Sequence, residues 1–546
     1  MFEVLPLDPA DLAVASDADV VDAIAGWARV ATQAEAFKVA AIGEWQHRNC
    51  ADPVGPRWAC DDWDNAAAQI GSALNISPGR ASGQMDLAVA LRDRFPKLGR
   101  RFMAGQVPVW MVSMVVWRTA LVVDGQALAQ LDSAFTDAID GWGVLSMAKL
   151  EHAIDMWIDK YDPDAVRRVR DRIRGRSFTV GKRDDATGTT SVFGRLSAVD
   201  AALVEERLTA MVRGVCDDDP RTTAQRRADA VGALAAGSLV LTCRCDNPDC
   251  AAATIDDGRA SSLTIHAVAD KASLDAPPDP GFNGPEPEHA VPTTAEARAK
   301  PAVKLTPGVI AGTRGAILPA SLLAELIAHG AKVRFVGGPD TITGSDGYRP
   351  SVALAEFVRA RDLTCRAPGC DRPAVHAEID HTRPWPTGPT HPSNLKCYCK
   401  FHHLIKTFWD GWSDMQLPDG TVQVTTPTGR TYVTKPFSRL LFPGWETTTA
   451  PSPGHDEPLP PRIPGREVMM PSRRYPREQA RRYRITAERR LNALQRERDV
   501  QAAAGAAARK AKRKAEERPA QPADYSGYFA HPRDHQPDYG DDPPPF

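Results

Sequence analysis

Two pairs of soft metal ligands lie 28 residues apart in the C-terminal half of this 546-residue chain. Cys365 and Cys370 form the first pair, and Cys399 with His402 forms the second. Zn²⁺ prefers four nitrogen or sulfur ligands in a tetrahedron, which two such pairs from separated turns can supply. A metal ion can hold a β-hairpin and a loop of this length where no hydrophobic core forms. The spacing therefore predicts a structural zinc site.

Four further polar residues in and beside this stretch are left over once the zinc has its ligands: Asp380, His381, Asn394 and His403. Hydrolysis of a phosphodiester needs a hard cation and a base that takes a proton from water. We expect Asp380 and His403 to hold Mg²⁺ or another divalent ion, and His381 to be the base. Asn394 is expected to brace the loop and orient His381. Because neighbours on a strand point to opposite faces, Asp380 and His381 require a bend between them.

These residues resemble the HNH endonuclease family, whose site is a β-hairpin followed by a helix around one divalent ion. Its pattern corresponds here to His381, Asn394, Leu395, His403 and Lys406. The chain departs from the pattern at His402, where many relatives have Cys, and Cys397 lies nearby as a spare thiol. The resemblance implies a zinc-stapled ββα-metal module that cleaves double-stranded DNA to 5′-phosphate and 3′-hydroxyl ends.

A narrower resemblance extends over roughly residues 20–445. It rests on four segments, residues 225–230, 348–351, 359–362 and 388–396. These are similar to the actinobacterial 13E12 repeat proteins, which join an N-terminal helical domain of unknown function to a C-terminal HNH module. The resemblance implies no activity for the helical domain.

Two readings without cleavage compete with the nuclease. One is a zinc knuckle that binds nucleic acid or a partner, and the other is a DNA-binding or mobile-element accessory protein that keeps the HNH frame. A knuckle needs neither the Asp-His pair nor His403, so these residues favour the enzyme. With DNA as the expected partner, Arg359, Arg361 and Lys406 are placed to approach it.

A second group of thiols lies upstream. Cys243, Cys245 and Cys250 offer three soft ligands in eight residues, and His266 or another Cys can complete a second zinc site. Buried or spare thiols are the alternative interpretation.

The predicted fold class is multidomain and mainly α with small β elements. Helices are expected at 17–48, 77–172, 198–214, 221–239, 319–329 and 351–361, and strands at 176–197, 261–269, 309–310 and 333–336. The predicted parts are an N-terminal extension (1–16), a mainly helical domain (17–274), a disordered Pro-rich insertion (275–301), a short mixed α/β segment (302–350), the HNH nuclease module with its β-hairpins (351–445), and a disordered tail with a basic run that can form a helix (446–546).

The sequence predicts a cytoplasmic protein that does not span a membrane. The N-terminus lacks the basic start of a signal peptide, and the most apolar stretch, 110–123, is too short to span a bilayer. We therefore expect the ten cysteines to be reduced. The net charge of −2 hides a basic run at 472–518, which favours phosphate as a partner. The oligomeric state is left open.

Overall fold

The computed structural model describes most of the chain. The described residues are 6–50, 57–142, 146–167, 176–184, 189–259, 267–277, 284, 305–310, 316–328, 331, 333–454 and 465–516. The chain divides into two compact units, Met1–Thr486 and Ala487–Phe546. Helices dominate and the sheets are small and antiparallel, which confirms a multidomain, mostly helical fold. Within those ranges, every helix is too short or too polar to cross a membrane.

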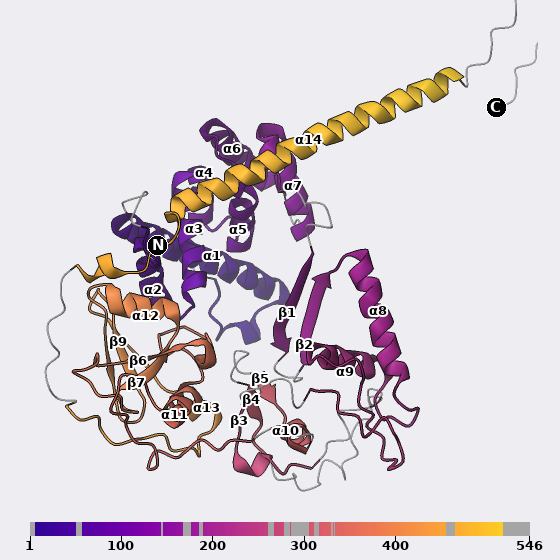
Figure 1. The fold of residues 1–546 in the computed structure, drawn as a ribbon. Coiled ribbons are helices and arrows are strands. Elements are labelled where there is room, and N and C mark those ends of the chain that lie inside the picture. Colours follow the sequence, from indigo (N-terminus) through magenta and orange to yellow (C-terminus); the bar gives the residue numbers. More distant parts are fainter. Residues whose placement is uncertain are drawn as a thin grey trace, which may run out of the picture. The chain divides into compact units, whose positions relative to one another are not determined.

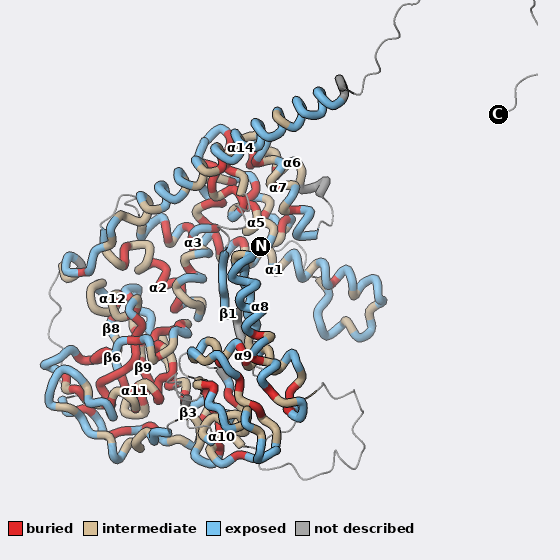
Figure 2. Tube along the Cα trace, turned by 45° about the vertical axis from the view of Figure 1, so that its right-hand side comes forward, coloured by how far each residue is buried: buried red, intermediate tan, exposed pale blue. Residues whose placement is uncertain are grey.

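The N-terminal part is a helical bundle. Its helices are α1 (Asp17–Asn49), α2 (Asp62–Leu74), α3 (Pro78–Asp93), α4 (Pro96–Met103), α5 (Val109–Arg118), α6 (Gly125–Trp142) and α7 (Met147–Tyr161). The predicted start of α3 is confirmed, because the Ser77 side chain accepts from the Arg80 N–H and Pro78 occupies the first helical position. Apolar side chains from α1 to α7 form one core, and buried residues run through α2 to α5 (Figure 2).

A hairpin and two helices follow the bundle. They are β1 (Ser177–Asp184), β2 (Thr189–Arg195), α8 (Ala198–Arg213) and α9 (Thr223–Ala235), as predicted. Residues 236–259 then contain no helix or strand. The next elements are β3 (Ala267–Val268), β4 (Gly308–Ile310), β5 (Ala316–Leu318) and α10 (Ala320–Ala328). Residues 278–283 and 285–301 of the predicted insertion lie outside the described residues.

The strand predicted at 333–336 is wrong. These residues pair with no strand in the described part of the chain. Val336 instead packs against the apolar cluster that contains Leu354 and Phe357. Val333 and Phe335 are exposed, so Val336 is the only apolar side chain of this run that packs against the cluster.

The C-terminal module contains the predicted ββα arrangement. Its elements are α11 (Val352–Asp362), β6 (Glu378–His381), β7 (Leu395–Tyr398), α12 (Lys400–Phe408), β8 (Ser413–Gln416), β9 (Val422–Thr425), β10 (Thr431–Thr434) and α13 (Ser438–Leu441). β6 and β7 pair antiparallel, and α12 follows β7 directly (Figure 1). β8, β9 and β10 form a three-stranded antiparallel sheet, joined by turns in which Gly420 and Gly429 adopt positive φ.

Beyond the module, part of the chain forms a long helix. α14 (Arg477–Glu516) lies at the basic run, and residues 446–454 and 465–476 precede it in the described part of the chain. Before this helix, Met470 is buried against Cys60. Arg473 and Arg477 form ion pairs with Asp61 and Asp64 at the N-terminus of α2. These contacts give the residues around 470–477 a fixed place that composition alone does not reveal.

Candidate functional site

Four buried side chains of the C-terminal module converge as the spacing predicts. Cys365 and Cys370 lie in the loop after α11, Cys399 is the N-cap residue of α12, and His402 lies in the first turn of that helix. The four ligand atoms lie within 4.8 Å of one another. His402 Nδ1 is 3.5 Å from Cys365 Sγ and 3.4 Å from Cys399 Sγ. This group can hold a metal ion, and three sulfurs with one imidazole nitrogen suit zinc.

The spare thiol, Cys397, is not part of this group. Its side chain is buried in a separate apolar cluster with Leu395 and Phe357. Its Sγ lies 3.9 Å from the Val358 carbonyl oxygen, and burial raises the pKa of the thiol well above its usual value. Cys397 therefore belongs to the apolar core, whereas Cys399 is a member of the metal-binding group.

Asp380 lies opposite Lys396 across the β6–β7 hairpin. Its Oδ2 accepts from Lys396 Nζ at 2.8 Å and from Lys406 Nζ at 2.7 Å. Its Oδ1 lies 3.4 Å from His403 Nε2. Burial opposes ionisation of Asp380, but the charges of Lys396, Lys406 and His403 outweigh it and lower the pKa of the carboxyl. Asp380 is thus an ionised, buried carboxylate with one oxygen directed towards His403.

Glu378 is a site residue that the sequence analysis missed. It lies two residues before Asp380 on β6, so both side chains project from the same face of the strand. Glu378 Oε2 pairs with Nδ1 of His403, which leaves Nε2 of that ring directed at Asp380. The sequence did carry a signal for Glu378, because residues two positions apart on a strand, such as Glu378 and Asp380, lie on the same face. Asp380 Oδ1 and His403 Nε2 are close enough to serve as two ligands of one divalent ion, and the carboxylate suits a hard cation.

His381 has different neighbours from Asp380, because both residues pair in continuous register with β7 and the bend expected between them is wrong. It is the last residue of β6, its ring stacks on Tyr348 with centroids 5.3 Å apart, and Nε2 lies 2.9 Å from Thr390 Oγ1. The Thr390 hydroxyl donates to the Gly347 carbonyl at 2.7 Å, so its oxygen accepts from His381 and Nε2 carries the proton. Nδ1 is then the basic nitrogen. Burial lowers the pKa of His381 and favours the neutral ring.

Asn394 braces the loop between the two strands, as predicted. Its Nδ2 donates to the carbonyls of Arg383 and Pro389, and its Oδ1 accepts from the Arg383 N–H at 2.8 Å. The expectation that Asn394 also orients His381 needs correction, because Thr390 is the residue that bonds the ring. Asn394 therefore affects His381 only indirectly, because it fixes the loop that carries Thr390.

Lys406 belongs to a buried charge cluster, which corrects its predicted approach to nucleic acid. Only 11% of its side chain is exposed, and it pairs with Asp380 and Asp414. Burial lowers the pKa of Lys406, whereas the two carboxylates outweigh burial and raise the pKa of Lys396. Lys396 and Asp414 were both missed because they come together only through β7 and β8. In this cluster the positive charges of Lys396 and Lys406 balance the negative charges of Asp380 and Asp414.

Arg361 also requires correction, because its side chain is fully buried. It donates to the carbonyls of Pro392 and Leu395 at 2.8 and 2.7 Å and pairs with Asp362. Asp362 in turn accepts from the Cys397 N–H at 2.7 Å. These contacts fix α11 to the start of β7, so Arg361 supports the hairpin and does not meet DNA. Arg359 is half-buried, and its contact with DNA stays a prediction.

Replacing Arg361 by alanine is expected to lower the free energy of unfolding by about 3–5 kcal/mol, because the buried carbonyls of Pro392 and Leu395 lose their donor and Asp362 keeps only Arg366 as a charged partner. Urea denaturation of the full-length protein measures the change. Arg334→Ala is the matched control, since it removes an exposed ion pair with Glu356 and is expected to cost at most about 1 kcal/mol. Equal effects of the two substitutions would show that Arg361 does not hold the module together.

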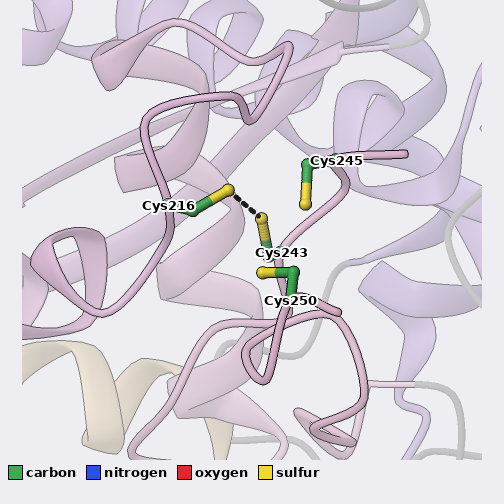
Figure 3. A group of neighbouring side chains, drawn as sticks. All are labelled: Cys216, Cys243, Cys245 and Cys250. Carbon is green, nitrogen blue, oxygen red and sulfur yellow. Dashed lines mark hydrogen bonds between the residues drawn. The ribbon is translucent and has the colours of Figure 1, made fainter. Parts of the chain in front are cut away.

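The upstream thiols also converge. Cys243, Cys245 and Cys250 lie with Cys216, and their four sulfur atoms are within 4.8 Å of one another (Figure 3). The fourth member is thus another cysteine, which the sequence analysis left unnamed. His266, its named alternative, lies outside the described residues.

Comparison with known proteins places this architecture in one family without giving an activity. The chain is 50% identical to uncharacterized protein Rv3776 of Mycobacterium tuberculosis (strain ATCC 25618 / H37Rv) over 490 residues, which cover 90% of this chain and 93% of that protein. It is 49% identical to uncharacterized protein Rv2100 of the same strain, over 90% of this chain and 91% of the relative. No solved structure matches the chain. A family model described as a domain of unknown function, DUF222, matches residues 25–362, which include the four upstream cysteines and end before Cys365. The chain therefore belongs to the DUF222 family.

Proposed function

We propose that this protein is a metal-dependent endonuclease of the HNH type that hydrolyses phosphodiester bonds in DNA. The observation that carries the proposal is the pairing of Asp380 Oδ1 with His403 Nε2 at 3.4 Å, on a hairpin and helix that also carry a four-ligand Cys/His group. A purely structural zinc module has no use for this second pair of ligands.

The ligand groups have separate roles in this proposal. The three cysteines and His402 would hold a structural zinc ion, which fixes the start of α12 against the hairpin. Asp380 and His403 would hold a divalent ion, which neutralises negative charge on the phosphate and the leaving oxygen when it is bound. Glu378 keeps the His403 ring in the orientation that turns Nε2 towards Asp380.

His381 supplies the base. Its Nδ1 accepts a proton from the attacking water, and Thr390 holds the opposite nitrogen, so the ring keeps the tautomer that this transfer needs. Stacking on Tyr348 fixes the plane of the ring. Burial favours the neutral form, which is the form that can accept a proton.

DNA is the proposed partner, and the basic residues of α14 are its proposed phosphate contacts. Deleting residues 487–546 is expected to weaken DNA binding and flatten its salt dependence, because each phosphate contact contributes about 0.9 to the slope of log affinity against log salt. Fluorescence anisotropy with a duplex at several salt concentrations measures both. A truncated protein with unchanged affinity and slope would remove α14 from the interface.

A DNA-binding or mobile-element accessory protein that does not cut is the second candidate. The observation in its favour is that Lys396 and Lys406 already neutralise the other oxygen of Asp380. Plasmid cleavage in Mg²⁺, Mn²⁺, Ni²⁺ and EDTA separates the two candidates. Cutting that EDTA abolishes supports the nuclease, whereas a folded, zinc-loaded protein that binds DNA without cutting supports the accessory protein.

We further propose a cytoplasmic location. All ten cysteines are free, and nine of them lie in ligand groups or are buried. Thiols of this kind keep their metal-binding form in a reducing compartment.

A further inference from the structure

Four cysteines meet in the part of the chain that matches the DUF222 family, far along the sequence from the proposed nuclease site. Cys216 follows the C-terminus of α8, whereas Cys243, Cys245 and Cys250 lie in residues 236–259 after α9. All four side chains point towards one centre (Figure 3). Cys216 and Cys243 have sulfurs 3.3 Å apart, and the whole set lies within 4.8 Å. Four sulfurs around one zinc ion at about 2.3 Å are about 3.8 Å apart, which falls within this range.

We propose that these four cysteines form a second structural zinc site, which organises the segment after α9. The site is independent of the proposed nuclease activity. Zinc binds cysteine as a thiolate. The first question is therefore whether the surrounding loops hold the four sulfurs close together.

Backbone hydrogen bonds hold the loop that carries three of the cysteines in a closed turn. The Cys243 N–H donates to the Ala252 carbonyl at 2.9 Å, and the Cys250 N–H donates to the Asn247 carbonyl at 3.1 Å. These bonds bring the backbone of Cys243 close to that of Cys250, so the fold places their sulfurs together through contacts that do not involve sulfur.

A buried ion-pair network holds the two cysteine-bearing loops together. Asp219, three residues after Cys216, accepts from the backbone N–H of Arg244 at 2.8 Å. Arg221 pairs with Asp219 and Asp229, and its own side chain is buried. These bonds hold the loop that carries Cys216 against the loop that carries Cys243 and Cys245. The ligands are therefore placed by contacts that do not involve the sulfurs.

The apolar support beneath these loops is small, which gives the metal a structural role. Residues 236–259 form no helix or strand, and long irregular segments of this kind need another source of order. The underlying cluster consists of small or medium side chains from α8, α9 and the loops: Leu208, Met211, Val215, Ala230, Ala233, Leu241 and Cys243. A zinc ion would link the end of α8 to the segment after α9 and supply the missing order.

Zinc content of the full-length protein tests the site. Cys245→Ser is expected to lose one equivalent of zinc per chain relative to wild type, whatever the nuclease module contains. Cys50→Ser is the matched control, because Cys50 is a half-buried free thiol outside both ligand groups, and its zinc content is expected to stay the same. Cys245→His replaces the sulfur by an imidazole ligand and is expected to retain the ion.

X-ray absorption at the zinc edge of the wild-type protein gives a test without substitution, in case Cys245→Ser does not fold. Occupancy of both groups predicts an average of about 3.5 sulfurs per zinc, and occupancy of the upstream group alone predicts about 4. An average of about 3 would place zinc only in the nuclease module and overturn the proposal. Unchanged zinc in folded Cys245→Ser, or a Cys216–Cys243 disulfide in freshly purified protein by mass spectrometry, would also overturn it.

Discussion

Replacing His381 by alanine is expected to reduce metal-dependent plasmid cleavage by about 10²–10⁴-fold, because the variant loses the proposed general base. The zinc content is expected to stay at the wild-type value, since His381 is not a member of either ligand group. The thermal unfolding temperature is expected to fall modestly, because the buried ring loses its stacking on Tyr348 and its bond to Thr390. Supercoiled plasmid incubated with Mg²⁺ or Mn²⁺ and resolved on a gel measures the cleavage rate. Metal analysis and differential scanning calorimetry on the same samples measure the rest.

His391→Ala is the matched control for this experiment. His391 lies in the same loop as Thr390, and burial lowers its pKa as it does that of His381, but it accepts from the Ser393 N–H and has no proposed catalytic role. Its cleavage rate is expected to stay within a few-fold of wild type. Cutting at the wild-type rate by His381→Ala would show that another group is the base.

Replacing Cys399 by serine is expected to unfold the C-terminal module and abolish cleavage. Cys399 is both a metal-facing sulfur and the N-cap residue of α12. Structural zinc in small domains contributes about 10–16 kcal/mol of apparent binding free energy, which is available only to the folded state. Loss of one zinc equivalent, together with rapid tryptic cleavage between residues 363 and 408, is the expected result.

Cys397→Ala provides the comparison within the same strand. Cys397 is buried in the apolar cluster and faces a backbone carbonyl, so its replacement is expected to keep the zinc and cost no more than a small core truncation. Zinc loss in Cys397→Ala with retention in Cys399→Ser would reverse the assignment of the two thiols. Because the upstream cysteines are untouched in both variants, this result is separate from the test of the second site.

The sequence predicted the parts of the site that depend on local spacing. Cys365, Cys370, Cys399 and His402 lie in two short pairs, so the chain geometry near each pair already restricts where the ligands go. The ββα order was implied by the resemblance to the HNH family and not by the spacing. The start of α3 was predicted from its Ser-Pro sequence, because capping is a property of neighbouring residues.

The parts that were missed depend on tertiary contacts between distant segments. Cys216 precedes Cys243 by 27 residues and has no ligand neighbour of its own, so only the packing of α8 against α9 shows that it joins the group. Arg361 looked like a phosphate contact, yet its guanidinium is used by two carbonyls near the start of β7. Charge alone does not distinguish a surface arginine from one that is buried with a partner.

The two ligand groups of the C-terminal module share the first turn of one helix. His402 faces the Cys/His group and His403 faces Asp380, although they are consecutive residues of α12. The two rings project in directions about 100° apart around a common axis, so no rotation of α12 can move one without the other. Where both groups hold an ion, a shift of α12 that changes one group also moves the other, and any resulting coupling of the two affinities is equal in both directions. In the proposed nuclease, the supply of zinc in the cell would then influence how much of the divalent ion cleavage requires.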